Sequence, residues 1–114
     1  MEGEIVQGAP VEVPEIGVEE VGGTGDDFTV IDVRNPDEYV EAHVPGVTLI
    51  PLSELADRIA EVPTDRRVYV ICRSGLRSET AARYMIEHGI DATNVAGGML
   101  AWIDAGKAVE AGPG

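Results

Sequence analysis

The sequence predicts one α/β domain with a central, mostly parallel sheet of about five short strands and helices on both faces. Apolar runs of strand length alternate with short helical patterns along the chain, which is typical of α/β domains. The run at residues 28–33 is almost continuously apolar, as expected of a parallel strand buried on both faces. With 114 residues, 44% of them hydrophobic, the chain is long enough to enclose one core.

The first third of the chain predicts two strands and a short helix. We expect a flexible acidic tail at residues 1–9 and an edge strand at residues 10–13, because prolines restrict a strand to the edge of a sheet. Residues 16–21 indicate a short helix that two glycines end, and the buried strand at residues 28–33 follows.

The middle third predicts two helices and a strand. Asn35 and Pro36 are typical of the cap and first residue of a helix, and acidic residues follow in its first turn. Residues 47–50 indicate a short strand. Ser53 can cap a second helix, whose apolar residues recur at helical spacing until Pro63 ends it.

The last third repeats the alternation of strand and helix. The predicted elements are a strand at 67–71, a helix at 76–88, a strand at 93–96 and a helix at 99–105. The domain is therefore expected to span residues 10–109, with a second flexible tail at residues 110–114.

The charge is strongly negative and unevenly distributed. The net charge is −13, and eight of the 21 acidic residues lie in the first 27 residues, which contain no base. Nucleic acid and membrane are therefore not expected as partners. The acidic segment suits a solvated surface and also a basic partner. The start of the sequence lacks a secretory apolar segment and no long apolar run follows, so we expect a cytoplasmic protein. Nothing in the sequence suggests more than a monomer.

Cys72, the only cysteine, is the strongest candidate for chemistry. It follows the strand at 67–71 and opens a tight loop before a helix, so backbone N–H groups and the positive end of a helix dipole surround its sulfur. Two arginines lie within five residues of it. These features favour the nucleophilic thiolate, whereas the alternative is an inert, buried thiol. One cysteine excludes an internal disulfide, and His43 and His88 lack metal-ligand spacing with it, so we expect neither metal nor cofactor.

The sequence resembles single-domain rhodaneses over about residues 14–109. The resemblance rests on Ile31-Asp32-Val33-Arg34 with Glu38-Tyr39, on His43-Val44-Pro45-Gly46, on the loop from Cys72 to Ser78, and on Gly97-Gly98 with Trp102. It implies a three-layer rhodanese-like fold and a sulfurtransferase that carries sulfur as a persulfide on Cys72. The donor would be a small anion such as thiosulfate. Because no second cysteine can resolve the persulfide, the acceptor would be an external thiol, cyanide or a protein.

The loop residues suggest separate roles. Gly75 lets the backbone bend so that N–H groups point at one anionic sulfur, from Arg73, Ser74, Gly75, Leu76, Arg77 and Ser78. The Ser78 hydroxyl can add a donor. Arg77 is suited to hold the loop or stabilise the persulfide, and Arg73 to face outward and attract the donor. Either arginine can instead pair with an acid: Asp32, Glu38 or Glu79.

The other motif residues are expected to support the loop. Asp32 is interpreted as a hydrogen-bond acceptor at a strand end, and Arg34 and Glu38 as a pair across one helical turn. His43 is expected to hold a turn by a hydrogen bond. Gly97 and Gly98 either let the backbone approach the loop closely or form a plain turn.

Other functions could use the same residues. A persulfide carrier or interaction module would deliver sulfur to a partner protein with little turnover. A cysteine phosphatase or arsenate reductase needs a wider cradle than the four residues between Cys72 and Arg77 provide. A regulatory domain without activity is disfavoured, because the cysteine and both arginines are present together.

Overall fold

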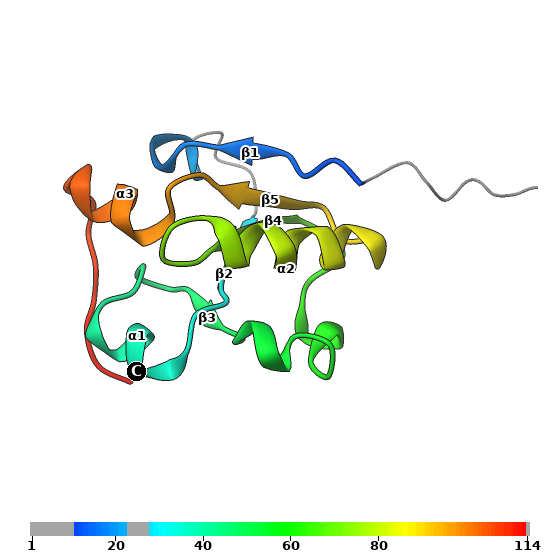
Figure 1. The fold of residues 1–114 in the computed structure, drawn as a ribbon, viewed down its shortest axis with the longest axis horizontal. Coiled ribbons are helices and arrows are strands. Elements are labelled where there is room, and N and C mark those ends of the chain that lie inside the picture. Colours follow the sequence, from blue (N-terminus) through cyan, green and yellow to red (C-terminus); the bar gives the residue numbers. More distant parts are fainter. Residues whose placement is uncertain (1–10, 23–27, 114) are drawn as a thin grey trace, which may run out of the picture.

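The computed structural model describes residues 11–22 and 28–113, and Figure 1 shows how their elements are arranged. One sheet contains five strands in the order β1 (Glu15–Ile16), β5 (Ala92–Val95), β4 (Arg67–Ile71), β2 (Phe28–Asp32) and β3 (Thr48–Leu49). Every neighbouring pair of these strands is parallel. The predicted α/β fold with a parallel sheet is therefore confirmed.

Helices cover both faces of the sheet. On one face, α2 (Leu76–Glu87) packs Ala81, Ala82 and Met85 against Val68 and Val70 of β4. The opposite face carries the elements α1 (Pro36–Glu41), α3 (Gly98–Asp104) and η2, a 3₁₀ turn at Val18–Glu20. Tyr69 and Ile71 of β4 belong to the core on this second face, because successive side chains of a strand point to opposite sides.

The edge strand lies at Glu15–Ile16, so its predicted position at residues 10–13 is wrong. β5 decides this position: the N–H of Asn94 donates to the carbonyl of Pro14, and that of Ala96 donates to the carbonyl of Ile16. A strand forms where a partner strand can pair with it, and local sequence does not contain that information. Because Ile16 belongs to the strand, the helix expected at residues 16–21 is reduced to η2.

The helix expected after Ser53 is also wrong in detail. The segment consists of two 3₁₀ turns, η3 (Leu52–Glu54) and η4 (Ile59–Glu61). Its buried side chains, Leu55 and Val62, still reach the core on the α2 face. The apolar spacing therefore predicted which side chains are buried, while packing against the sheet decided the backbone conformation.

The carboxyl ends of β2 and β4 lie side by side. Asp32 is in register with Ile71, and the N–H of Val33 donates to the carbonyl of Ile71 at 3.0 Å. Cys72 follows Ile71 directly, so the cysteine and the segment Asp32–Arg34 meet at one edge of the sheet, where ligand sites of such folds lie.

The C-terminal segment runs beside α1. Glu110 and His43 exchange two backbone hydrogen bonds of 2.8 Å, and the N–H of Gly112 donates to the carbonyl of Val40 at 2.8 Å. These bonds join part of the segment expected as a flexible tail, residues 110–114, to the domain. The tail expected at residues 1–9 lies outside the described residues. In residues 11–22 and 28–113, no helix combines the length and apolar character that crossing a membrane requires.

Candidate active site

Cys72 lies at the mouth of the predicted loop, with its sulfur surrounded by donors. The residue is only 1% exposed. The N–H of Gly75 donates to Sγ at 3.1 Å, and the Ser78 Oγ lies 3.2 Å from the same sulfur. Gly75 has a φ of +106°, a conformation that other residues rarely adopt, and this turns its N–H toward the sulfur. The sequence then enters α2 at Leu76.

These donors favour the thiolate over the thiol. Burial raises the pKa of Cys72, because an apolar environment disfavours charge. The hydrogen bonds from the Ser78 hydroxyl and from the N–H groups of Ser78, Gly75 and Ser74 lower it by more, so the pKa of Cys72 lies below its ordinary value. The loop is thus suited to a cysteine that acts as a nucleophile.

Three residues of the loop are exposed, and their surface is here called the entrance of the loop. Arg73 and Ser74 are exposed, as predicted for Arg73. Leu76, at the start of α2, is 74% exposed although it is a large apolar residue. The entrance therefore combines a cation with an apolar side chain.

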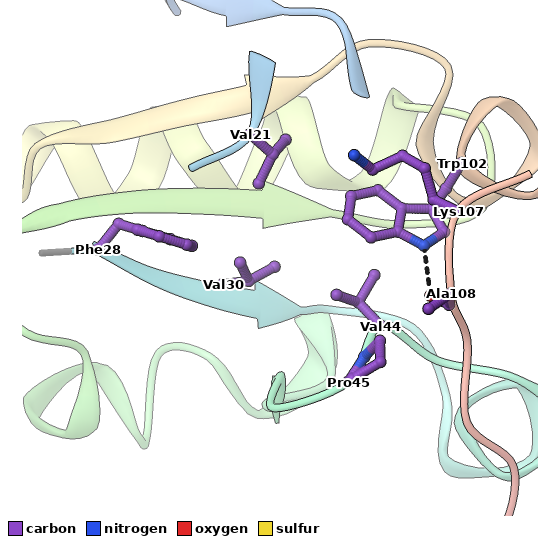
Figure 2. A pocket seen from close by; sticks show the side chains of 8 residues that line it. All are labelled: Val21, Phe28, Val30, Val44, Pro45, Trp102, Lys107 and Ala108. Carbon is purple, nitrogen blue, oxygen red and sulfur yellow. Dashed lines mark hydrogen bonds between the residues drawn. The ribbon is translucent and has the colours of Figure 1, made fainter. Parts of the chain in front are cut away.

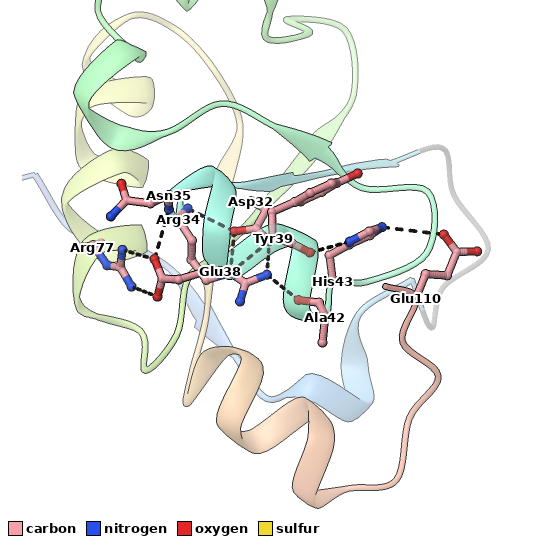
Figure 3. Close-up of polar contacts among 9 residues, drawn as sticks. All are labelled: Asp32, Arg34, Asn35, Glu38, Tyr39, Ala42, His43, Arg77 and Glu110. Atoms are coloured by element: carbon pink, nitrogen blue, oxygen red, sulfur yellow. Dashed lines mark hydrogen bonds and ion pairs between the residues drawn. The ribbon is translucent and has the colours of Figure 1, made fainter. Parts of the chain in front are cut away.

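Arg77 is partly exposed and pairs with Glu38 of α1. Its two terminal nitrogens donate to the two carboxylate oxygens of Glu38 at 2.8 and 2.9 Å, a bidentate ion pair (Figure 3). The hydrogen bond from Arg77 lowers the pKa of Glu38 from 4.5 to about 2, although burial opposes it. A further bond, from the N–H of Asn35 at 3.0 Å, holds the same carboxylate at the start of α1. Of the three acids the sequence offered as partners, Glu38 is the one that Arg77 contacts.

Asp32 and Arg34 form a buried ion pair at the end of β2. The Arg34 side chain donates to both carboxylate oxygens of Asp32, its Nη2 at 2.7 Å, and also to the carbonyl of Ala42 at 2.7 Å (Figure 3). Asp32 is a hydrogen-bond acceptor, as predicted. The expected pair of Arg34 with Glu38 is wrong, since each of these residues has another bidentate partner.

His43 holds the turn after α1, as expected. Its Nδ1 donates to the carbonyl of Tyr39 at 2.7 Å, and its ring stacks on the Tyr39 ring with centres 3.7 Å apart. Its Nε2 lies 3.7 Å from the Glu110 carboxylate (Figure 3). His43 is buried and does not contact Cys72, so its contacts are those of a structural residue.

The Gly97-Gly98 pair allows the backbone to approach the loop closely. A Cβ on Gly98 would overlap the carbonyl oxygen of Cys72 and lie 2.7 Å from the carbonyl group of Arg73. The N–H groups of Met99 and Leu100 donate to these same two carbonyls, at 2.8 and 3.1 Å. The start of α3 therefore braces the backbone of the cysteine loop, and the alternative of a plain turn is wrong.

Asn94 of β5 contacts the loop and was not predicted as a site residue. Its Oδ1 is 2.5 Å from the Ser78 Oγ, and its Nδ2 donates to the carbonyl of Gly75 at 3.1 Å and to the carboxylate of Glu15 at 2.9 Å. Asparagine is uncommon inside strands and needs partners when buried. An Asn in the predicted strand at 93–96 was the signal that could have found it.

A pocket of about 200 Å³ lies beside the loop. Its lining includes Arg73, the acid Glu38, and Leu100 and Ile103 of α3, which are themselves half exposed. Apolar side chains near a buried nucleophile offer a contact surface for a larger acceptor.

A second pocket, of about 460 Å³, lies on the sheet face opposite α2 (Figure 2). Its lining is apolar apart from Lys107, whose Nζ lies 4.6 Å from the centre of the Trp102 ring. No residue of the Cys72 loop lines it. Among the residues that the structure describes, no three His, Cys, Asp or Glu side chains are grouped closely enough to hold a metal ion.

A family model, curated relatives and solved structures all match this chain to rhodanese-like or sulfur-transferring proteins. The sequence model of the rhodanese-like domain family matches residues 19–105. A putative sulfur carrier protein of Bacillus subtilis, YrkF, is 40% identical over 94 residues, which are 79% of this chain and 51% of that protein. A sulfurtransferase of Allochromatium vinosum is 33% identical over 90 residues, 78% of this chain and 84% of that one. The crystal structure of a rhodanese-related protein from Thermoplasma volcanium superposes with a TM-score of 0.80 at 30% identity, covering 85% of this chain and 97% of the other.

Proposed function

Because this chain belongs to the rhodanese-like domain family, we propose that it transfers sulfane sulfur from an anionic donor such as thiosulfate to a thiophilic acceptor through a persulfide on Cys72. The observation that carries this proposal is the position of the Gly75 N–H and the Ser78 hydroxyl, 3.1 and 3.2 Å from the sulfur. Preorganised donors of this kind stabilise the thiolate charge on Sγ, both before it attacks the donor and when it leaves in the second step.

The reaction has two displacement steps. In the first, the Cys72 thiolate attacks the outer sulfur of thiosulfate, the S–S bond of the donor breaks, and sulfite leaves with the electron pair. In the second, the acceptor attacks the outer sulfur of the persulfide, the Sγ–S bond breaks, and Cys72 leaves as a thiolate. With cyanide as acceptor the product is thiocyanate, and with a thiolate it is a new persulfide. Charge balances in both steps, and no redox partner is needed.

The exposed Arg73 is proposed to attract the donor, and Arg77 to hold the loop. Arg73 follows Cys72 directly and is exposed, so its positive charge can attract an anion to the loop. Arg77 is committed to Glu38 on both of its terminal nitrogens, so it fixes α1 against α2 rather than binding the donor directly.

A second candidate function is a carrier that transfers its sulfur to a partner protein. It is favoured by exposed apolar side chains of the loop and of α3. Leu76, Leu100 and Ile103 are 74%, 49% and 52% exposed. A small anion makes no use of such side chains, whereas a protein acceptor can cover them. The relative from Bacillus subtilis is also named as a putative sulfur carrier.

The test follows sulfur on Cys72. The protein is incubated with thiosulfate, its mass is measured, and cyanide is then added while thiocyanate is measured. A gain of one sulfur atom and rapid turnover, both abolished in Cys72→Ala, support the transferase; the same gain with slow turnover supports the carrier. Hydrolysis of a phenyl phosphate ester without sulfur loading would overturn both in favour of phosphatase chemistry.

A further inference from the structure

The Ser78 hydroxyl has one proton and two acceptors. Its Oγ lies 3.2 Å from the Cys72 sulfur and 2.5 Å from Oδ1 of Asn94. A serine hydroxyl donates one hydrogen bond only. Ser78 and Asn94 are 0% and 1% exposed, so bulk water does not supply a second donor or acceptor.

The orientation of Asn94 follows from its other contacts. The atom that faces the carbonyl of Gly75 and the carboxylate of Glu15, at 3.1 and 2.9 Å, must be the amide nitrogen, because both partners only accept. The amide oxygen therefore faces Ser78. Of the contacts that the structure gives this oxygen, the Ser78 hydroxyl is the donor.

We propose that Asn94 is a positioning residue that competes with Cys72 for the single proton of Ser78. While Sγ carries no charge, Ser78 donates to Asn94. When Sγ becomes a thiolate, the Ser78 O–H turns to the sulfur, since a hydrogen bond to an anion is stronger than one to an amide oxygen. Ser78 thereby follows the charge, and Asn94 accepts its proton in the other state.

This competition acquires a role in sulfur transfer if the proposed function holds. As the inner atom of a persulfide, Sγ is neutral and the charge lies on the outer sulfur. When the acceptor attacks the outer sulfur, the Sγ–S bond breaks and Sγ leaves as a thiolate. The Ser78 O–H then turns from Asn94 to the leaving sulfur. Its hydrogen bond to Sγ therefore forms as charge develops on that sulfur.

The charged groups near the sulfur are the same in all variants of the test. They lie on five elements: Arg73 in the loop, Arg77 of α2 with Glu38 of α1, the Asp32–Arg34 pair at the end of β2, and Glu15 of β1. Asn94→Ala also removes the amide donor of Glu15, and the double variant shares this loss, so the comparison of the two variants isolates the hydrogen bond of Ser78.

The test titrates Cys72 through the ultraviolet absorbance of its thiolate, with Cys72→Ala as the blank. Cys72 is the only cysteine, so the signal belongs to one group. In Ser78→Ala the pKa of Cys72 rises, because a donor is lost. In Asn94→Ala the competitor is lost, so the pKa falls by about half a unit to one unit, the value of one ordinary hydrogen bond. In the double variant Ser78→Ala/Asn94→Ala this fall is absent.

The opposite sign overturns the proposal. If Asn94 only supported the loop through Gly75, its removal would loosen the donors and raise the pKa of Cys72, or leave it unchanged. An equal fall in the double variant would also overturn it. Thr93→Val is the matched control, since Thr93 is buried in the same strand and points to the other face; it leaves the pKa unchanged. If Asn94→Ala does not fold, Asn94→Leu removes the same acceptor with a side chain of similar shape and no cavity.

The titration needs no sulfur donor, so it separates this proposal from the proposed function. A fall in the pKa of Cys72 in Asn94→Ala together with absent thiocyanate formation in the wild type would uphold the competition and refute the sulfurtransferase. Thiocyanate formation with a raised pKa in Asn94→Ala would do the reverse.

Discussion

Replacing Gly98 with alanine places a methyl group against the backbone of the cysteine loop. The new Cβ would overlap the carbonyl oxygen of Cys72 and lie 2.7 Å from the carbonyl carbon and oxygen of Arg73. These atoms are backbone and cannot rotate away as a side chain can. Gly98 also has a φ of +55°, in the left-handed region that disfavours a side chain.

The cost of this substitution has two parts. The left-handed conformation costs about 1–2 kcal/mol for a residue with a Cβ. Relief of the overlap requires α3 and the loop to move apart, and such overpacking typically costs about 1–3 kcal/mol. We therefore expect Gly98→Ala to lower the free energy of unfolding by about 3 kcal/mol, a large part of the roughly 5–15 kcal/mol of a small domain.

Gly106→Ala provides the matched control. Gly106 has a φ of +76°, but a Cβ there would meet nothing within 4 Å, so only the conformational cost of about 1–2 kcal/mol remains. Both variants are unfolded in urea, and the thiolate absorbance of Cys72 is titrated. We expect Gly98→Ala alone to raise the pKa of Cys72, because the loop donors move. Equal destabilisation by the two variants, with an unchanged pKa in both, would refute the close approach of α3 to the loop.

Three further predictions concern the charged and polar neighbours of the loop. The pKa of Glu38 is about 2 in the folded protein against 4.5 for an unperturbed carboxyl. The folding stability that this ionised carboxylate contributes is therefore fully present above pH 4.5 and is lost as the pH falls toward 2. The free energy of unfolding of Glu38→Gln should therefore depend less steeply on pH in this window than that of the wild type. Equal slopes for the two proteins would contradict the Glu38–Arg77 ion pair. Arg73→Glu should raise KM for thiosulfate about tenfold, equivalent to 1.4 kcal/mol, with discharge of the persulfide unchanged, whereas Arg66→Glu at the other end of β4 should leave KM unaltered. His43→Ala should lower stability by about 2–3 kcal/mol without moving the pKa of Cys72, and a shifted thiolate titration would count against a structural role.

Local sequence predicted the elements that bear the site with good accuracy. The strand at 67–71 has the predicted bounds, and α2 starts at the predicted Leu76. Both follow from local causes: β-branched residues favour the strand, and Gly75 supplies the turn that precedes the helix. The start of α1 was predicted for the same reason, because Pro36 is suited to the first helical position.

The edge strand and the partners of the polar residues could not be predicted in this way. Arg34 is four residues from Glu38 and was the natural partner, yet Glu38 pairs with Arg77, which is 39 residues away in the sequence. Asn94 is 16 residues from Ser78 and 79 from Glu15. Contacts at such separations exist only once the order of the strands has brought the segments together.

By itself, the sequence determined that a thiolate-favouring loop follows a buried strand, because a glycine, a strand end and a helix start act over a few residues. Only the tertiary structure decided which donors and acceptors surround that loop. The parallel order β1-β5-β4-β2-β3 brings Asn94 behind Ser78 and places α3 against the carbonyl of Cys72. Burial then makes each of these groups depend on the partners nearby, since water is excluded from replacing them.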